Sequence, residues 1–204
     1  MKIIPLPVMS WEANSYLVIR EKHAVLIDAG ADADSVKKTL SEQDATLDYV
    51  LLTHGHFDHT LSVDKLREWS VAPIIIHEAD AEMLTDAEKS AQYHFFGTRS
   101  THAAADKTVV HGDRLPLGDL AATVYHTPGH SLGSVCYQIG NALFSGDTLF
   151  AAGYGRCDLY GGDMNALSRS LGSLRELDQD LTIYPGHGGT AKLGNALDNL
   201  FGLI

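Results

Sequence analysis

The segment at residues 53–59, Thr-His-Gly-His-Phe-Asp-His, constrains the fold of this chain more than any other part. It follows an apolar run at 49–52, so we expect a strand that ends in a polar loop. Four side chains within six residues can bind a metal ion: His54, His56, Asp58 and His59. Imidazole nitrogens and carboxylate oxygens are the ligands that zinc and similar ions prefer. The segment therefore predicts a metal site, and the alternative is a polar loop that is rich in histidine by chance.

The spacing within this segment favours two metal ions over one. His54 and His56 alternate along the chain, whereas the adjacent Asp58 and His59 project in other directions. The four side chains are therefore poorly placed to reach one ion together. We expect two ions side by side, with the chain turning between them.

Three later segments also place a ligand type beside a small residue where a strand ends. They are Thr-Pro-Gly-His-Ser at 127–131, Ser-Gly-Asp-Thr at 145–148 and Tyr-Pro-Gly-His-Gly at 184–188, with the candidate ligands His130, Asp147 and His187. One Pro-Gly-His alone would be read as a turn with an exposed histidine. Together with the first cluster, the three segments indicate one shared site. Gly129 is expected to allow a close approach of the backbone.

The pattern of apolar residues predicts an α/β chain with one domain over residues 1–204. Strands are expected at 3–9, 15–20, 23–27, 47–53, 73–77, 121–127, 134–139, 142–144 and 181–184. Helices are expected at 34–43, 60–69, 78–84 and 163–177, with a helix or tail at 194–204. Two halves rich in strands and flanked by helices predict two sheets face to face with helices outside.

Several single residues carry expectations of their own. Two roles fit Asp28, which ends a strand: it holds a ligand histidine from behind, or it caps a turn or helix. Gly30 is expected in a turn conformation that is closed to other residues. The irregular stretch 86–112 holds His94, His102 and His111, which we expect to be surface or structural histidines. Its aromatic residues are expected to wall a substrate cleft or to form a satellite core: Tyr93, Phe95 and Phe96.

Composition limits the partners of this chain. A formal charge of −11, from 15 Lys and Arg against 26 Asp and Glu, argues against binding to nucleic acid. No apolar run reaches the ~20 residues of a membrane span, and the first seven residues do not resemble a secretion signal. We therefore expect a cytoplasmic protein, a monomer or small homo-oligomer, that acts on a small molecule. Cys136 and Cys157 are expected to be free thiols, with Cys136 in the core, and a disulfide is the alternative.

In their order along the chain, the motifs T-H-G-H-F-D-H, P-G-H-S, G-D-T-L-F and Y-P-G-H-G resemble those of the metallo-β-lactamase-fold hydrolases. The resemblance implies a four-layer αββα sandwich with two divalent metal ions at one edge of the sheets, Zn²⁺ in the first place and Fe or Mn otherwise. It implies that one ion is held by His54, His56 and His130 and the other by Asp58, His59 and His187. Asp147 would bridge the two ions.

Residues 146–150, 153–156 and 161–163 are similar to the glyoxalase II-like branch, also called hydroxyacylglutathione hydrolase-like. That branch implies hydrolysis of a thioester, typically an acyl-glutathione, by a metal-bridging hydroxide that Asp58 also orients. Arg156 would bind a substrate carboxylate, unless it is a structural arginine. Tyr154 and Tyr160 would line the same mouth.

The chain departs from this branch in three places. It ends soon after His187, where full-length glyoxalase II continues into a helical domain. Leu61-Ser62 replaces the usual glycine pair, and Asp158 stands where tight glutathione binders often have tyrosine. These departures bear on the substrate rather than on the fold or the metals.

Other functions remain as alternatives. A persulfide dioxygenase would use one iron in a site of the kind formed by His54, His56 and Asp147, and it shares the G-R-x-D pattern at 155–158. A nuclease normally carries a basic surface and a lactamase a signal for export, and neither feature is visible in the sequence. A metal-stabilised binding protein without activity would lack a ligand, and all seven are present.

Overall fold

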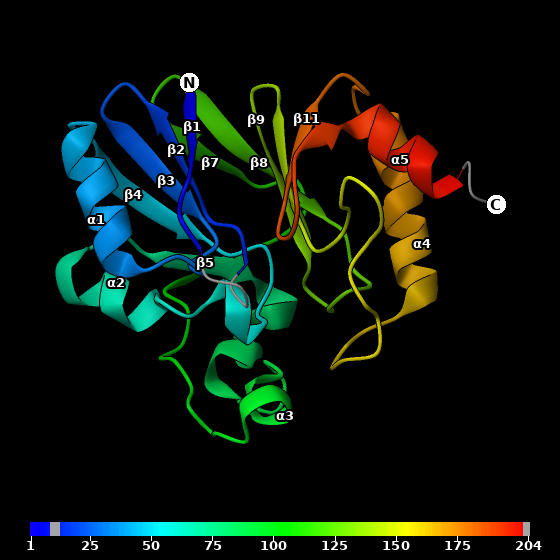
Figure 1. Ribbon diagram of the computed structural model, residues 1–204, viewed down its shortest axis with the longest axis horizontal. Helices are drawn as coiled ribbons and strands as arrows, with labels where there is room; N and C mark the ends of the chain where they lie inside the picture. The colour runs from blue at the N-terminus through cyan, green and yellow to red at the C-terminus, as the bar shows by residue number, and fades with distance from the viewer. Residues whose placement is uncertain (9–12, 202–204) are drawn as a thin grey trace.

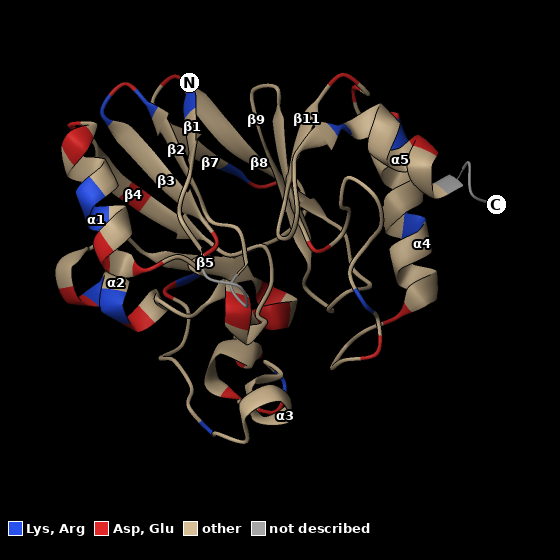
Figure 2. Ribbon diagram, viewed as in Figure 1, with Lys and Arg blue, Asp and Glu red and all other residues tan. Residues whose placement is uncertain are grey.

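The computed structural model describes residues 1–8 and 13–201, and two mixed sheets stand face to face in it with helices on both outer sides (Figure 1). The predicted four-layer α/β sandwich is thereby confirmed. The central strands carry few charged residues, which gather on the outer helices and the loops (Figure 2). Within the described ranges, no helix combines the length and the apolar character needed to cross a membrane.

The first sheet is built from the N-terminal half of the chain. Its strands, in spatial order, are β1 (Lys2–Pro5), β2 (Tyr16–Arg20), β3 (His23–Ile27), β4 (Thr46–Leu51), β5 (Ile74–His77) and β6 (Lys107–Val109). The first three strands pair antiparallel, and β3 to β6 pair parallel. Parallel neighbours end at the same edge of a sheet, which places the loop after β4 at that edge.

The second sheet is built from the C-terminal half. Its strands, in spatial order, are β12 (Ala191–Lys192), β11 (Thr182–Pro185), β10 (Ala142–Gly146), β9 (Val135–Ile139), β8 (Leu120–His126) and β7 (Arg114–Leu117). Only β10 and β11 pair parallel among these strands of the described chain. The carboxyl ends of β8, β10 and β11 therefore lie at one edge of this sheet.

Three apolar clusters hold the layers together. The middle cluster lies between the sheets and includes Ile27, Leu51 and Phe144. The alternate residues of the first sheet, such as Leu26 and Val50, face outward onto α1 and α2. Because both faces of the central strands are covered, these strands read as continuous apolar runs in the sequence.

The helices follow the expected pattern with local differences. The α-helices are α1 (Ala33–Glu42), α2 (Val63–Trp69), α3 (Gln92–Phe96), α4 (Met164–Ser173) and α5 (Leu193–Phe201). Three segments form 3₁₀ helices: η1 (Phe57–His59), η2 (Glu78–Thr85) and η3 (Leu174–Glu176). The expected helix at 78–84 is thus a 3₁₀ helix. The strands β6, β7 and β12 and the short helix α3 were not expected from the sequence.

Two further expectations can be compared with the described chain. The strand expected at 3–9 ends at Pro5, and its last residue lies outside the described residues, as do 202–204 of the expected terminal helix. The expectation for Gly30 was wrong, because the positive φ of +57° belongs to Asp28 instead. Gly30 is needed for another reason: a Cβ there would lie 2.6 Å from the carbonyl oxygen of Ala13.

Candidate metal centre

The structure brings all seven candidate ligands together at the shared edge of the two sheets. His54 and His56 lie in the loop after β4, and Asp58 and His59 lie in η1. The other three follow the ends of β8, β10 and β11: His130, Asp147 and His187. Three groups have ligand atoms within 4.8 Å of one another: His54, His56 and His130; His54, His59 and Asp147; Asp58, His59 and His187.

The loop that carries His130 passes very close to helix α4, and this close contact requires a glycine at position 129. Gly129 has a φ of +138°, and a Cβ there would lie 2.2 Å from the backbone nitrogen of Leu167 at the start of α4. The expectation of a close backbone approach at Gly129 is confirmed. Any larger residue would push the loop, and His130 with it, away from the centre.

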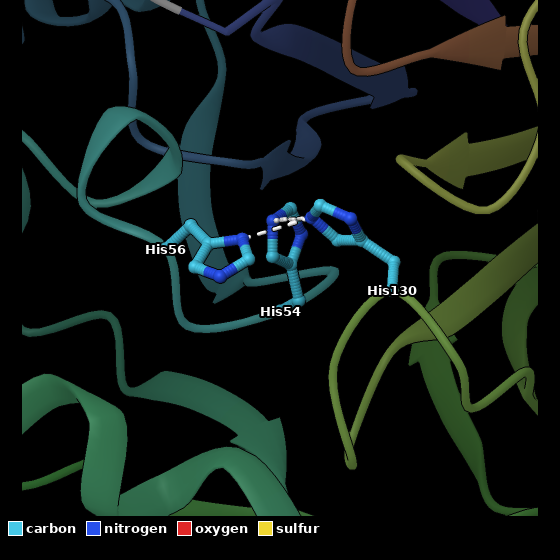
Figure 3. A group of neighbouring side chains, drawn as sticks. All are labelled: His54, His56 and His130. Carbon is cyan, nitrogen blue, oxygen red and sulfur yellow. Dashed lines mark hydrogen bonds between the residues drawn. The ribbon is translucent and has the colours of Figure 1, made fainter. Parts of the chain in front are cut away.

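In the first group three ring nitrogens converge on one point (Figure 3). His130 Nε2 lies 2.8 Å from His56 Nδ1 and 3.1 Å from His54 Nε2. The other nitrogen of His130, Nδ1, donates to the backbone carbonyl of Arg156 at 2.7 Å. That carbonyl can only accept, so the neutral His130 ring presents a lone pair at Nε2.

His54 is held in the same tautomer. Its Nδ1 lies 3.1 Å from the hydroxyl oxygen of Thr53, whose own hydrogen is donated to the carboxylate of Asp28. His54 Nδ1 therefore donates, and the Nε2 of this ring carries a lone pair. Burial and the neighbouring histidines His59 and His130 lower the pKa of His54 well below 6.5. Lone pairs this close to one another repel, unless a cation lies between them.

The second group combines oxygen and nitrogen atoms. Asp58 Oδ2 lies 3.2 Å from His187 Nε2 and 3.8 Å from His59 Nε2. The carboxylate of Asp147 contacts histidines of both groups: Oδ1 lies 3.3 Å from His59 Nε2, and Oδ2 lies 3.5 Å from His187 Nε2 and 3.6 Å from His130 Nε2. Asp147 thus stands between the two groups, as the resemblance implies for a bridging ligand.

Three buried polar atoms at the centre have no hydrogen-bond partner among the described residues: His56 Nε2, His59 Nε2 and Asp147 Oδ1. Unpaired polar atoms of this kind are rare in protein interiors and need an explanation. His56 meets the first group through Nδ1, so its Nε2 is not part of that group. His59 Nε2 and Asp147 Oδ1 lie 3.3 Å apart, and an imidazole nitrogen beside a carboxylate oxygen is a donor pair expected of a zinc or iron site. The residues present therefore fit divalent metal ions.

The charges in the second group are complementary even before a metal is considered. Burial alone would raise the pKa of Asp147, but His59 and the other histidines hold it far below its ordinary value. In return, burial opposes the charged form of His59, and Asp28, Asp58 and Asp147 raise its pKa well above 6.5. A bound cation takes the place of these protons, so binding is expected to release them.

The buried carboxylate of Asp28 binds the ring nitrogen of His59 that faces away from the second group's other ligands. Asp28 Oδ2 accepts a hydrogen bond of 2.8 Å from His59 Nδ1, and Asp28 Oδ1 accepts one of 2.7 Å from the backbone N–H of Thr53. Of the two roles considered for Asp28, the contact with a ligand histidine is confirmed. Its positive φ shows that it also forms the turn. This bond leaves His59 Nε2 facing Asp147.

Asp80 of η2 was not singled out from the sequence, although it ties two ligand loops together. Its fully buried carboxylate accepts from the Ser131 hydroxyl and the Gly133 N–H, both at 2.6 Å, and from the Gly55 N–H at 3.2 Å. Gly55 lies between His54 and His56, and Ser131 follows His130. One aspartate near a helix start gives no sequence signal for such a role.

A cleft of about 380 Å³ opens beside the centre. Its lining comprises His56, Phe57, Asp58, Ala91, Phe95, His130, Asp147, Phe150, Gly155, Arg156, Leu159 and His187. Phe95, the one member of the aromatic trio in this lining, thus walls the cleft, as the first of its two readings predicts. Arg156 also lines it, but its guanidinium binds the carboxylate of Asp158 through two bonds of 2.6 and 2.8 Å.

The two tyrosines expected at the mouth lie outside this lining. The hydroxyl of Tyr160 donates to Glu82 at 2.6 Å, and the side chain of Tyr154 is exposed. A role of either in binding substrate stays a prediction. Both cysteines of the described chain are free, and Cys136 is buried, as expected.

The remaining six histidines, His23, His77, His94, His102, His111 and His126, belong to none of the three groups. His77 and His126 stack on each other, with ring centroids 4.0 Å apart. His102 pairs with Asp64 at 2.8 Å. These contacts agree with structural roles.

Comparison with known proteins finds a family match over most of this chain. It matches the sequence model of the metallo-beta-lactamase superfamily over residues 10–187. The probable metallo-hydrolase YqgX of Bacillus subtilis is 33% identical over 192 residues, which cover 92% of this chain and 90% of YqgX.

Two solved structures extend the likeness to three dimensions. The B3 metallo-beta-lactamase BLEG-1 aligns with a TM-score of 0.91 and 34% identity, covering 98% of this chain and 99% of that chain. TTHA1623, crystallised in a di-iron-bound form, aligns with a TM-score of 0.84 and 32% identity, covering 94% and 96%. Because both the sequence match and these alignments span most of its length, this chain belongs to the metallo-beta-lactamase superfamily.

Proposed function

We propose that this protein is a hydrolase with two divalent metal ions that cleaves a thioester. The observation that carries the proposal is the position of Asp147, whose carboxylate contacts His130 of one ligand group and both His59 and His187 of the other. His54, His56 and His130 would hold one ion, and Asp58, His59 and His187 the other, with Asp147 between them. Two adjacent ions would acidify a water molecule and polarise the carbonyl group of the substrate.

The chain itself contributes orientation and charge. The backbone carbonyl of Arg156 and the carboxylate of Asp28 fix the rings of His130 and His59, so that their free nitrogens face the centre. The carboxylate of Asp58, whose side chain is 17% exposed, reaches the cleft and is placed to orient the attacking water. A thiol leaving group has a pKa near 8.5, so it departs as a thiolate without a strong general acid.

Two observations bear on the chemistry and the metal. YqgX is named a probable metallo-hydrolase, which supports hydrolysis. TTHA1623 is described with two irons, which supports a binuclear centre and leaves iron as an alternative to zinc. A thioester rather than another carbonyl compound is favoured by the residues at 146–163 that resemble the glyoxalase II-like branch.

Hydrolysis of β-lactams is the second candidate, because BLEG-1 is described as a B3 metallo-beta-lactamase and covers nearly the whole chain. Water activated at the same centre would also be able to attack a lactam carbonyl. The leaving group would then be an amine, which needs a proton. A persulfide dioxygenase with one iron is the third reading. Metal content separates it from the other two, since it requires one iron per chain and consumes oxygen.

The test combines elemental analysis with a substrate panel. The purified protein is expected to hold two ions per chain and to hydrolyse thioesters faster than the β-lactam nitrocefin. His56→Ala and Asp58→Ala are expected to lower thioester turnover by at least about a hundredfold while circular dichroism stays unchanged. Near-normal turnover in either variant would contradict the assignment. A single iron per chain together with oxygen uptake in the presence of glutathione persulfide would show that the protein is a persulfide dioxygenase instead.

A further inference from the structure

The cleft beside the metal centre has an apolar wall that metal binding does not explain. Apart from five of the candidate ligands, its lining consists of Phe57, Ala91, Phe95, Phe150, Gly155, Arg156 and Leu159. Arg156 is the one charged side chain in this remainder, within the described part of the chain. The apolar side chains come from three separate segments: η1, the region of α3, and the loop after β10.

Aromatic rings line the cleft in two places, beside α3 and beside the second ligand group. The ring of Phe57 lies 5.5 Å from that of Phe95 and 5.2 Å from that of Phe96, between centroids. At the other end, the ring of Phe150 lies 6.0 Å from that of His187. Phe95 remains 48% exposed although it lines the cleft. An apolar group placed against it would remove that surface from water, which favours binding.

The positive charges beside this wall already have partners. The guanidinium of Arg156 is bound by Asp158. Lys89 and Arg99, which flank Ala91 and Phe95 in the sequence, form ion pairs with Glu82 and Glu88. A thiol carrier with several carboxylates, such as glutathione, would have to compete with these acidic residues for each cation.

We infer that the substrate carries an apolar acyl group, alkyl or aromatic, which lies against Phe57, Phe95 and Phe150 while its carbonyl faces the metal ligands. The thiol carrier contributes little to recognition. This inference rests on the proposed thioester hydrolysis and names the class of thioester.

The experiment uses acetyl, butyryl, hexanoyl and phenylacetyl thioesters of the neutral thiol N-acetylcysteamine with the metal-loaded protein. Full burial of a methylene group is worth about fourfold in affinity. Because the cleft is open on one side, we expect about twofold per methylene, and so roughly fifteenfold in kcat/KM between acetyl and hexanoyl, which differ by four methylenes. The same acyl groups on glutathione are expected to give kcat/KM within about twofold of the neutral series.

Three variants locate the effect. Phe95→Ala should remove most of the preference for hexanoyl and phenylacetyl over acetyl thioesters. Phe96→Ala removes an aromatic ring that contacts Phe57 but does not line the cleft, so its effect should be smaller. Val71→Ala truncates a fully exposed apolar side chain outside the cleft and serves as the control.

A binding measurement separates the two proposals. Calorimetric titration with acetate, hexanoate and phenylacetate, the carboxylate products, should show at least about fivefold tighter binding of the two apolar acids. If thioesters are hydrolysed with no preference for apolar acyl groups, or only when glutathione is the carrier, the inference fails and the proposed function stands. If no thioester is hydrolysed but the apolar acids bind more tightly, the proposed function fails and the apolar cleft stands. Equal binding of all three acids overturns the inference directly.

Discussion

Asp28 gives the sharpest test of how the chain prepares its metal centre. Its carboxylate only accepts hydrogen bonds, so His59 must donate from Nδ1, and Nε2 is the nitrogen that presents a lone pair once a cation displaces its proton. In Asp28→Asn, the amide oxygen can still accept from the Thr53 N–H, which leaves the NH₂ group facing His59 Nδ1. Both would then be donors. His59 is therefore expected to move its proton to Nε2, the atom that the second ion needs.

The size of this effect follows from the bonds involved. The 2.8 Å bond between His59 and Asp28 is buried and charge-assisted, and losing such a bond costs about 1.5–3 kcal/mol. Loss of a carboxylate that orients a ligand histidine typically lowers metal affinity about 10–100-fold, which corresponds to about 1.4–2.7 kcal/mol. The two figures agree. The first group, which does not include His59, should keep its ion.

The assay measures metal content after dialysis and metal affinity by competition with a chromophoric chelator. Asp28→Asn is expected to retain about one ion per chain where the wild type retains two. Asp32→Asn provides the matched control, because Asp32 caps α1 and asparagine caps helices equally well. An Asp28→Asn variant that is folded and binds both ions with wild-type affinity would refute the tautomer argument.

Three further predictions concern stability. Asp80→Ala should lower the free energy of unfolding by about 2–5 kcal/mol, because the N–H of Gly133 and the hydroxyl of Ser131 lose their buried acceptor. The variant should therefore unfold at a lower urea concentration, and an unchanged midpoint would contradict a stabilising role of Asp80. Burial and the stacked His126 lower the pKa of His77 from 6.5 to about 4, so the folded state binds fewer protons than the unfolded state between these values and loses stability as the pH falls from 6.5 to 4. In chelator-treated protein, His77→Asn should make the Tm fall less between pH 6.5 and 4 than it does in the wild type. An equal fall of the Tm in both proteins would contradict this prediction. Removal of the metal with a chelator should lower the Tm by several degrees at pH 7, and an equal Tm would show that the centre is empty or uncoupled from folding.

Much of the metal centre was predictable because its candidate ligands lie in short segments that directly follow strands. The ligands from His54 to His59 lie within six residues, and His130, Asp147 and His187 each follow a strand, whose end places them at the edge of a sheet. Strands covered on both faces are also visible as apolar runs, which explains why most of both sheets was expected.

What the sequence could not show depends on contacts between distant residues. The carboxylate of Asp80 meets partners 51 and 53 residues further along the chain, and nothing near it marks that role. The guanidinium of Arg156 is bound by Asp158, two residues further along the chain, and a role of Arg156 in binding a substrate carboxylate stays a prediction. The helix α3 has no buried residue and β6 has three residues, so neither leaves a periodic apolar pattern.

The arrangement of the ligands along the chain bears on how the protein could be divided. Both ligand groups draw on both sheets: the first sheet supplies His54, His56, Asp58 and His59, and the second supplies the rest. A cut between β6 and β7, within residues 110–113, would separate the chain into two fragments that each hold an incomplete set for either ion. Reassembly of such fragments should then depend on added divalent metal, which would make this fold a metal-triggered split protein.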